Sequence, residues 1–342
     1  MNGQVVIKRF SSEAPRNPLG DPIERELCLY LPPGYASDSA RRFPVAYCLT
    51  GFAGRGRMLL NAQPFSPNLA ERMDNLLAAG RAGEMIIAMP DCFTRLGGSQ
   101  YINSTAIGRY EDYLIAELVP FVDHGFRTRS DAAGRAIVGK SSGGYGALVL
   151  AMRHPDVFGA AASHSGDCYF EYGYLPDFAK AKRAIAGDVS RFVEKFWAAE
   201  KKGKDDVTAL NIIAMSACYS PDPAHQPLGF RLPFDTHSGE IDHAVWSRWL
   251  EQDPVRMVRK YAENLRRLKL LFIDAGTRDE YGLDLGARIL CEQLRRHNVS
   301  FTHEEFDDGH FNTTYRYDRS LALISQALSA SLCVFFSVIL CV

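Results

Sequence analysis

Charge of one sign is what this sequence most clearly lacks. Its 39 basic and 40 acidic residues leave a net charge of -1 at pH 7. A nearly neutral chain gives no electrostatic reason to expect a nucleic acid or an anionic membrane as partner. Internal repeats, low-complexity segments and a secretory apolar run near the start are also missing. We therefore expect a globular, cytoplasmic protein that binds no nucleic acid.

Cysteine pairs at the C-x-x-C spacing of metal and redox sites are absent as well. The eight cysteines are scattered between Cys28 and Cys341, and several stand inside apolar runs. This distribution favours buried free thiols in a reducing compartment over a disulfide framework or a zinc site.

The sequence does contain a regular alternation of strand-like and helix-like segments. The expected strands are 4–10, 26–31, 43–49, 84–89, 136–138, 158–164, 268–275 and 299–306, the first two antiparallel, and the expected helices include 69–79, 110–122 and 285–296. Such alternation predicts an α/β fold, with a mostly parallel central sheet and helices on both faces. Functional sites in these folds lie at the carboxyl ends of the strands.

Two stretches do not follow this alternation. Residues of about 167–250 are rich in aromatic residues, proline and charge, and we expect a lid-like, cap-like insertion within a single domain that covers 1–330. Residues 331–342 form an almost wholly apolar C-terminal tail. This tail has three interpretations: an extension of the last core helix, a membrane anchor, or a sequence end foreign to the fold.

Residues 139–143 read Gly-Lys-Ser-Ser-Gly, between an apolar run and a helix-forming run. Glycines on both sides of Ser141 remove side chains that would collide with the strand and the helix at a sharp turn. The turn would lift the Ser141 hydroxyl above the sheet, where the first N–H groups of the helix also point. This context predicts a nucleophilic serine, and the alternative is a glycine-rich turn with a solvated serine.

An activated serine needs a base within hydrogen-bond reach and an acid that orients the base. Asp279 follows the expected strand 268–275, and His310 follows the expected strand 299–306. Sheets of this class deliver the three groups in the order serine, acid, histidine. We predict His310 as the general base and Asp279 as the acid, with Glu280 as the alternative acid one residue away.

The negative charge that develops on a substrate carbonyl oxygen needs two fixed N–H donors. The first predicted donor is the N–H of Ser142, which follows the nucleophile. The second should come from the loop after strand 43–49, which contains Gly51-Phe52, and we assign it to Phe52. Gly54 keeps this loop open to a ligand. A plain glycine turn is the alternative for this loop.

With these motifs the chain resembles the "Putative esterase" (esterase D-like) family of α/β hydrolases over roughly residues 20–325. The resemblance rests on Leu-Pro-Pro-Gly-Tyr35, Thr-Gly51-Phe, Met-Pro-Asp91-Cys, Gly-Gly98-Ser-Gln-Tyr-Ile-Asn-Ser, Tyr110-Glu-Asp-Tyr, the serine turn, Gly-Thr-Arg-Asp279 and Asp-Gly-His310. It implies the α/β-hydrolase fold, a Ser141–His310–Asp279 triad, and backbone donors at Phe52 and Ser142. The family includes S-formylglutathione hydrolases, enterochelin esterases, feruloyl esterase domains and mycolyltransferases, so it does not define the substrate.

We therefore expect a serine carboxylesterase that cleaves a small acyl or aryl ester through an acyl-enzyme and requires no metal or cofactor. The alternatives are an acyltransferase of the same fold, an S-formylglutathione-type thiolester hydrolase and a catalytically silent binding protein. The long aromatic insertion argues against the thiolester hydrolase. The sequence is compatible with a homo-oligomer, and we expect membrane contact only through the tail.

The substrate pocket should lie between the loop at 92–101 and the aromatic insertion. The residues expected to contact the substrate are Gly51, Cys92, Tyr101, Tyr169, Trp246 and Phe230.

Overall fold

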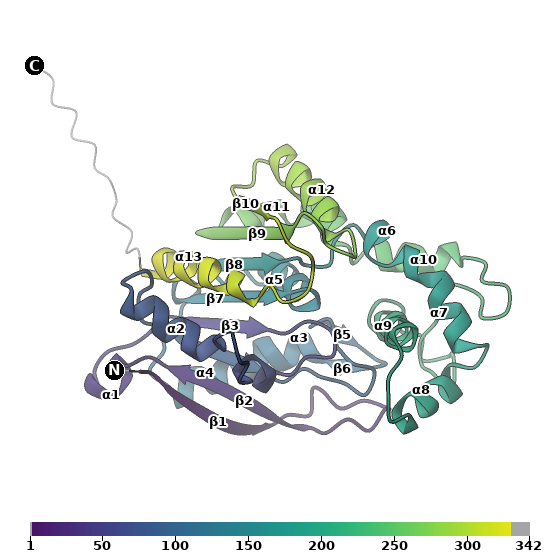
Figure 1. The fold of residues 1–342 in the computed structure, drawn as a ribbon, viewed down its shortest axis with the longest axis horizontal. Helices are drawn as coiled ribbons and strands as arrows, with labels where there is room; N and C mark the ends of the chain where they lie inside the picture. Colours follow the sequence, from purple (N-terminus) through teal and green to yellow (C-terminus); the bar gives the residue numbers. More distant parts are fainter. Residues whose placement is uncertain (1, 330–342) are drawn as a thin grey trace, which may run out of the picture.

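An eight-stranded sheet runs through the centre of the molecule (Figure 1). The computed structural model describes residues 2–329. In space the strands follow the order β1-β2-β4-β3-β7-β8-β9-β10; β2 is antiparallel to both of its neighbours, and all other neighbours are parallel. The strands are β1 (Gln4–Ser11), β2 (Glu24–Leu31), β3 (Val45–Leu49), β4 (Ile86–Pro90), β7 (Arg135–Lys140), β8 (Ala160–His164), β9 (Leu270–Gly276) and β10 (Thr302–Phe306). Every predicted strand is present, and the first two pair antiparallel as expected.

Alternate side chains of these strands enter two hydrophobic cores, one on each face of the sheet. In β3, Val45, Tyr47 and Leu49 belong to the first core, whereas Ala46 and Cys48 belong to the second. This period of two is the pattern of a sheet that is buried on both faces. The first core is covered by α3 (Tyr110–Asp112), α4 (Val119–Gly125), α5 (Ser142–Arg153), α11 (Pro254–Arg266) and α12 (Leu283–Arg296), and the second by α2 (Leu69–Ala78) and α13 (Tyr317–Ser329). The predicted fold class is confirmed.

Apart from short 3₁₀ helices, three short elements of this part of the chain were not predicted. They are α1 (Gly34–Ser37) and the two strands of a small separate hairpin, β5 (Asn103–Ser104) and β6 (Gly108–Arg109). The predicted helix at 110–122 is continuous, but a π-helical segment at Tyr113–Leu118 joins α3 to α4.

A group of helices between β8 and α11 lies to one side of the sheet (Figure 1), and we call it the cap. Its members are α6 (Phe170–Gly173), α7 (Phe178–Ile185), α8 (Val189–Ala198), α9 (Lys204–Tyr219) and α10 (His243–Leu250). They fall within the range of about 167–250 where the sequence predicts an insertion. The ring centre of Trp249 lies 5.4 Å from that of Tyr219, 5.7 Å from Tyr174 and 5.8 Å from both Phe178 and Trp246. Packed aromatic rings therefore hold the cap helices together.

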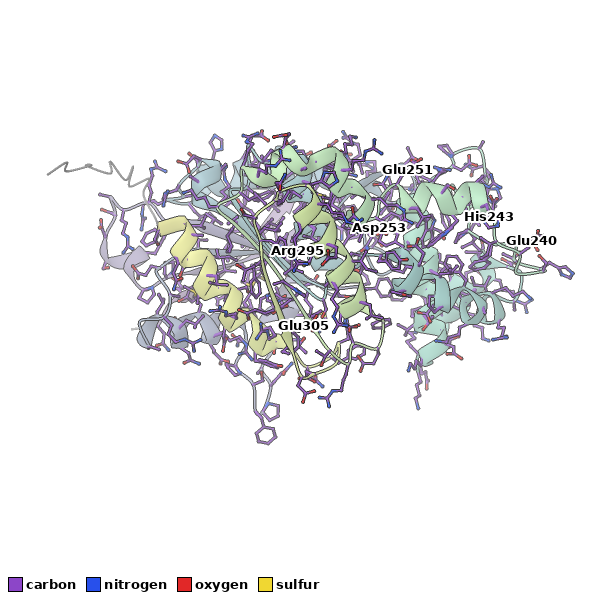
Figure 2. All side chains as sticks on the ribbon, turned by 90° about the horizontal axis from the view of Figure 1, so that it is seen from above. Glu240, His243, Glu251, Asp253, Arg295 and Glu305 are labelled. Carbon is purple, nitrogen blue, oxygen red and sulfur yellow. The ribbon has the colours of Figure 1, made fainter. Side chains whose placement is uncertain are left out.

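One buried carboxylate, Asp253, ties the two ends of the cap together. It accepts hydrogen bonds from the backbone N–H groups of Tyr169 (3.0 Å) and Phe170 (3.1 Å) at the first end and of Val255 (2.9 Å) just past the second end. The Arg256 guanidinium also donates to it, at 3.0 Å. Figure 2 shows Asp253 where the cap meets the sheet, with Glu240 and His243 labelled toward the far end of the cap.

No helix within residues 2–329 is long and apolar enough to cross a membrane. The predicted apolar tail at 331–342 lies outside the described residues, together with Cys333 and Cys341. The six cysteines that the structure describes are buried and free, as the sequence predicts. Burial raises the pKa of the Cys48 thiol to about 12, so this side chain stays protonated at neutral pH.

Candidate active site

The serine turn has the strained backbone that its glycine pattern predicts. Ser141 connects β7 to α5 with a φ of 57° and a ψ of -125°, a combination that residues other than glycine rarely adopt. A Cβ on Gly139 would lie 2.3 Å from the carbonyl oxygen of Gly143, and a Cβ on Gly143 would lie 2.3 Å from that of Leu49. Both glycines are therefore required for the strand, the turn and the helix to approach so closely.

Three side chains from three strand ends form one hydrogen-bonded chain. Nε2 of His310 lies 3.0 Å from Oγ of Ser141, and Nδ1 of His310 lies 2.8 Å from Oδ2 of Asp279. Asp279 comes from the loop after β9, and His310 comes from the loop after β10. When Nδ1–H donates to Asp279, Nε2 is left to accept the Ser141 proton. The structure thus brings together the predicted nucleophile, base and acid.

The surroundings of Asp279 favour its ionised form. Burial by itself raises the pKa of this carboxyl, but the hydrogen bond from His310 and those from the N–H groups of Tyr281 (3.0 Å) and Leu283 (3.5 Å) outweigh burial. The pKa therefore lies below its ordinary value, and the carboxylate can orient the imidazole. Glu280, the alternative acid, instead accepts the backbone N–H of His310 at 2.7 Å and so holds the loop that carries the imidazole.

Two backbone N–H groups beside Ser141 are available to bind an oxyanion. Ser142 is the first residue of α5, so its N–H has no acceptor within the helix. Neither this group nor the N–H of Phe52 donates to a backbone carbonyl elsewhere in residues 2–329. Gly51 lies directly against the nucleophile, since a Cβ there would be 3.2 Å from Cβ of Ser141. The Tyr101 hydroxyl donates to the Thr50 carbonyl at 2.6 Å and thereby fixes the Phe52 loop.

The other predicted substrate contacts have packing roles that account for their burial. Cys92 and Tyr101 belong to the first core, and Trp246 and Phe230 are buried beside the cap helices. Tyr169 is half-buried at the start of α6 and has a left-handed backbone. Contact between these five residues and the substrate stays a prediction.

Two aromatic residues that the sequence analysis did not select stand beside the imidazole. The ring centres of Tyr281 and Phe311 lie 5.0 Å and 5.3 Å from that of His310. Both rings are exposed, by 38% and 55%, so they offer an apolar surface next to the reacting groups. Both residues could have been selected from the sequence, because they lie within two residues of Asp279 and His310.

Left-handed backbone at residues other than glycine gathers on the loops around this site. Each such residue costs about 1–3 kcal/mol and persists only where the surrounding packing fixes it, commonly at functional sites. The residues near the site are Ala53, Gln100, Tyr101, Ser141, Ser165, Tyr169 and Asn312.

A second serine–histidine–aspartate chain exists, but it is sealed from solvent. Nε2 of His164 lies 2.8 Å from Oγ of Ser320, and Nδ1 lies 2.7 Å from Oδ1 of Asp274. Ser320 and Asp274 have no exposed surface, and His164 is only 3% exposed. Because no substrate can reach these groups, we assign them a structural role in joining α13 to β8 and β9.

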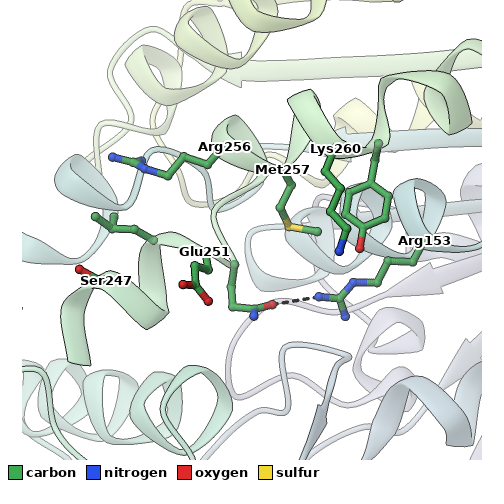
Figure 3. Close-up of a pocket in the computed structure, with 9 residues that line it drawn as sticks. Arg153, Ser247, Glu251, Arg256, Met257 and Lys260 are labelled. Atoms are coloured by element: carbon green, nitrogen blue, oxygen red, sulfur yellow. Dashed lines mark hydrogen bonds between the residues drawn. The ribbon is translucent and has the colours of Figure 1, made fainter. Parts of the chain in front are cut away.

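A pocket of about 620 Å³ lies away from Ser141, between α10 and α11 (Figure 3). Its two arginines already have protein partners: Arg153 contacts Glu111 and Gln252, and Arg256 contacts Glu171. The residues that line this pocket include no activated nucleophile. We therefore choose the Ser141 site as the candidate active site, because it has the hydrogen-bonded serine, histidine and aspartate. Its lining is Arg153, Ser247, Leu250, Glu251, Gln252, Arg256, Met257, Lys260 and Tyr261.

A mostly parallel sheet with a serine at the strand–helix turn, and with an acid and a histidine at later strand ends, defines the class of α/β hydrolases. Within this class, the family described as "Putative esterase" matches residues 22–322. The chain belongs to this family.

Named relatives agree with this class. An endo-1,4-beta-xylanase/feruloyl esterase of Xylanibacter ruminicola is 29% identical over 160 residues, which are 46% of this chain and 21% of the relative. An esterase of Mycobacterium tuberculosis is 32% identical over 165 residues, which are 44% of this chain and 35% of the relative. The chain thus spans much less than two thirds of the length of these relatives.

Solved structures share the fold over nearly the whole chain. A ferulic acid esterase superposes with a TM-score of 0.63 at 20% identity and covers 95% of this chain and 99% of its own. An S-formylglutathione hydrolase of Staphylococcus aureus superposes with a TM-score of 0.59 at 16% identity and covers 96% of this chain and 100% of its own. At such low identity these likenesses concern the fold alone.

Proposed function

We propose that this chain is a serine carboxylesterase that hydrolyses small carboxylic esters through an acyl-enzyme. Ser141 is the nucleophile, His310 the general base and acid, and Asp279 the carboxylate that orients His310. The N–H groups of Phe52 and Ser142 form the oxyanion hole. The observation that carries this proposal is the continuous hydrogen-bonded chain from the strained Ser141 to the ionised Asp279.

In the first half-reaction, Nε2 of His310 takes the Ser141 proton as Oγ bonds to the ester carbonyl carbon. The two N–H groups stabilise the oxyanion, the bond to the alcohol oxygen breaks, and His310 protonates that oxygen as it leaves. A water molecule then gives its proton to His310 and attacks the acyl-enzyme. The bond to Oγ breaks, the acid is released, and Ser141 recovers its proton.

The variant Ser141→Ala tests this proposal. We expect kcat for 4-nitrophenyl acetate to fall by at least about 10⁴-fold, because no other group can form the acyl-enzyme. The melting temperature should hold, and a fluorophosphonate probe should label Ser141 in the parent enzyme alone. Ser320→Ala is the matched control, because it removes the hydroxyl of the sealed chain and should keep the activity. Undiminished hydrolysis by Ser141→Ala would contradict the serine mechanism.

The same site supports a related activity if an alcohol and not water removes the acyl group. Product analysis in the presence of added alcohols separates this acyltransferase from the hydrolase. Because some of the compared proteins are named for ferulic acid, methyl ferulate belongs in the substrate panel beside short acyl esters. The six buried free cysteines support the cytoplasm as the site of action.

A further inference from the structure

A buried polar cluster, formed by Gln100, Asp167, Tyr174 and Tyr219, adjoins the serine turn. Each of the four is more than nine-tenths buried. Gln100 comes from the loop before β5, Asp167 from the turn after β8, and the two tyrosines from the cap. The proposed mechanism uses none of these side chains, so their burial requires another explanation.

Within the described residues, all hydrogen bonds to the Asp167 side chain are accepted by one oxygen, Oδ2. Oδ2 accepts hydrogen bonds from the Tyr174 hydroxyl (2.7 Å), from Nε2 of Gln100 (3.1 Å) and from the Ser142 hydroxyl (3.2 Å). Nε2 of Gln100 also lies 2.8 Å from the Tyr219 hydroxyl. Ser142 supplies the proposed oxyanion donor next to Ser141, so this carboxylate is coupled directly to the catalytic turn.

The other oxygen, Oδ1, has no donor among residues 2–329. It is also not sealed: Asp167 keeps 7% of its surface exposed, and Oδ1 is not among the enclosed polar atoms that lack a partner in this part of the chain. The carboxylate also lies beside the serine turn, because its Oδ2 is 3.2 Å from the hydroxyl of Ser142, the residue after Ser141. An accessible acceptor without a protein partner therefore lies next to the serine turn.

This arrangement is costly to the fold. Burial raises the pKa of Asp167, although hydrogen bonds from Tyr174 and Gln100 act in the opposite direction. Oε1 of Gln100 is enclosed without a hydrogen-bond partner in the described residues, and Gln100 and Tyr101 are strained, with φ of 49° and 59°. A buried, incompletely paired polar group generally destabilises a protein, and such groups are found where function requires them.

We propose that Oδ1 of Asp167 accepts a hydrogen bond from the substrate, so that the enzyme selects esters with a hydroxyl or a protonated amine within a few bonds of the scissile carbonyl. The inference rests on the proposed esterase function and deepens it. An ester without such a donor would displace water from Oδ1 and leave the carboxylate unpaired. Sites built around a hydrogen bond discriminate strongly against ligands that lack it.

Three pairs of esters of similar shape test this selection. The first places a hydroxyl in the acyl part, as 4-nitrophenyl 3-hydroxybutyrate against 4-nitrophenyl butyrate. The second places it in the alcohol, as 2-hydroxyethyl butyrate against propyl butyrate. The third pair has a protonated amine in place of the hydroxyl, and compares 2-(dimethylamino)ethyl butyrate with 3-methylbutyl butyrate. Each kcat/KM is divided by the hydroxide-catalysed rate of the same ester, which removes differences in intrinsic reactivity.

We expect the donor-bearing ester to be preferred by about ten- to a hundredfold in at least one pair, the range for a hydrogen bond to a charged group. In Asp167→Asn this preference should fall by at least about fivefold, and further for the cation than for the hydroxyl, because the amide carries no charge. Asp253→Asn is the matched control: it changes a buried aspartate at the base of the cap, and it should keep the preference of the parent enzyme.

Three results would overturn the inference. They are corrected ratios near one for all three pairs in the parent enzyme, a preference that Asp167→Asn retains, and an equal loss of preference in Asp253→Asn. Hydrolysis of propyl butyrate and labelling of Ser141 by a fluorophosphonate report on the esterase function separately. If the protein hydrolyses propyl butyrate and is labelled at Ser141 but shows no preference, only the Asp167 subsite is disproved. If it neither hydrolyses propyl butyrate nor is labelled, the proposed esterase function is disproved.

Discussion

At the scale of single residues, this molecule contains two serine–histidine–aspartate chains with nearly equal hydrogen-bond lengths. The chain at Ser141 has distances of 3.0 and 2.8 Å, and the chain at Ser320 has distances of 2.8 and 2.7 Å. What separates them is the environment of the serine. Ser141 stands on a strained turn beside two available N–H groups, whereas Ser320 lies inside a helix with no exposed surface. Access and oxyanion donors, not hydrogen-bond distances, therefore distinguish the proposed catalytic triad from the structural one.

The two neighbouring acids, Asp279 and Glu280, should respond very differently to amide substitution. Asp279→Asn should lower kcat by about 10⁴-fold, because an amide no longer fixes the productive tautomer of His310. Glu280→Gln keeps an oxygen for the backbone N–H of His310 and should lower kcat by no more than about tenfold. Steady-state kinetics on 4-nitrophenyl acetate checks both. Equal losses would mean that the structure assigns the acid to the wrong residue.

Asp167 should make stability depend on pH. Its pKa is raised in the folded state, so the carboxyl contributes most to stability when protonated, and that contribution is lost as the pH rises through the folded pKa. An asparagine side chain at this position would not titrate. The melting temperature of Asp167→Asn, relative to the parent, should therefore increase between about pH 4.5 and about pH 8. A difference that is constant across this range would contradict the raised pKa.

The sequence identified the candidate residues that follow strand ends and that the structure brings together, and it missed the cluster that distant segments form around Asp167. Ser141, Asp279 and His310 each have a local signal, since a glycine turn or a short loop comes directly after an apolar run. Asp167 also follows a strand, but its role depends on Gln100 and on two cap tyrosines far along the chain. No local sequence pattern indicates that these four residues lie together in the fold.

At the scale of elements, the sealed chain at Ser320 fastens α13 to the sheet. Ser320→Ala would leave Nε2 of His164 buried without this partner, which should lower the free energy of unfolding by about 1–3 kcal/mol. The catalytic groups are untouched, so kcat should not change. Denaturant unfolding and an esterase assay on the same preparation measure both. A loss of activity at unchanged stability would instead connect His164 to catalysis.

The strands and the main helices that cover the sheet were predicted well, and the helices of the cap were not. The helices at 69–79 and 285–296 carry an apolar stripe and were found to within two residues. In α9, every residue but one from Ala209 to Tyr219 is buried, so the apolar period that marks a surface helix is lost. The helices α7 and α8 do keep an apolar stripe, with Phe178, Ala181 and Ile185 buried on α7, but here the sequence was interpreted only as an insertion rich in aromatic residues, proline and charge.

At the scale of the whole molecule, the aromatic rings of the cap continue the hydrophobic core on one face of the sheet. Trp249→Ala should destabilise the cap by about 3–5 kcal/mol, because it empties the space among Tyr174, Phe178 and Tyr219. Hydrogen exchange followed by mass spectrometry should show faster exchange in α9 and unchanged exchange in β3 and β7. Equal acceleration in the sheet would show that the two parts unfold as one unit.

Asp253 has a consequence for how such an enzyme diversifies. A single carboxylate holds the start of the cap and the start of α11 together at one point. The neighbouring strands can therefore keep their positions when the length of the chain between these two points changes. A replacement cap would need only two backbone N–H groups that donate to Asp253 in order to be held in the same place. Replacement of the cap would then change the ester preference of the proposed esterase and leave Ser141, Asp279 and His310 in place.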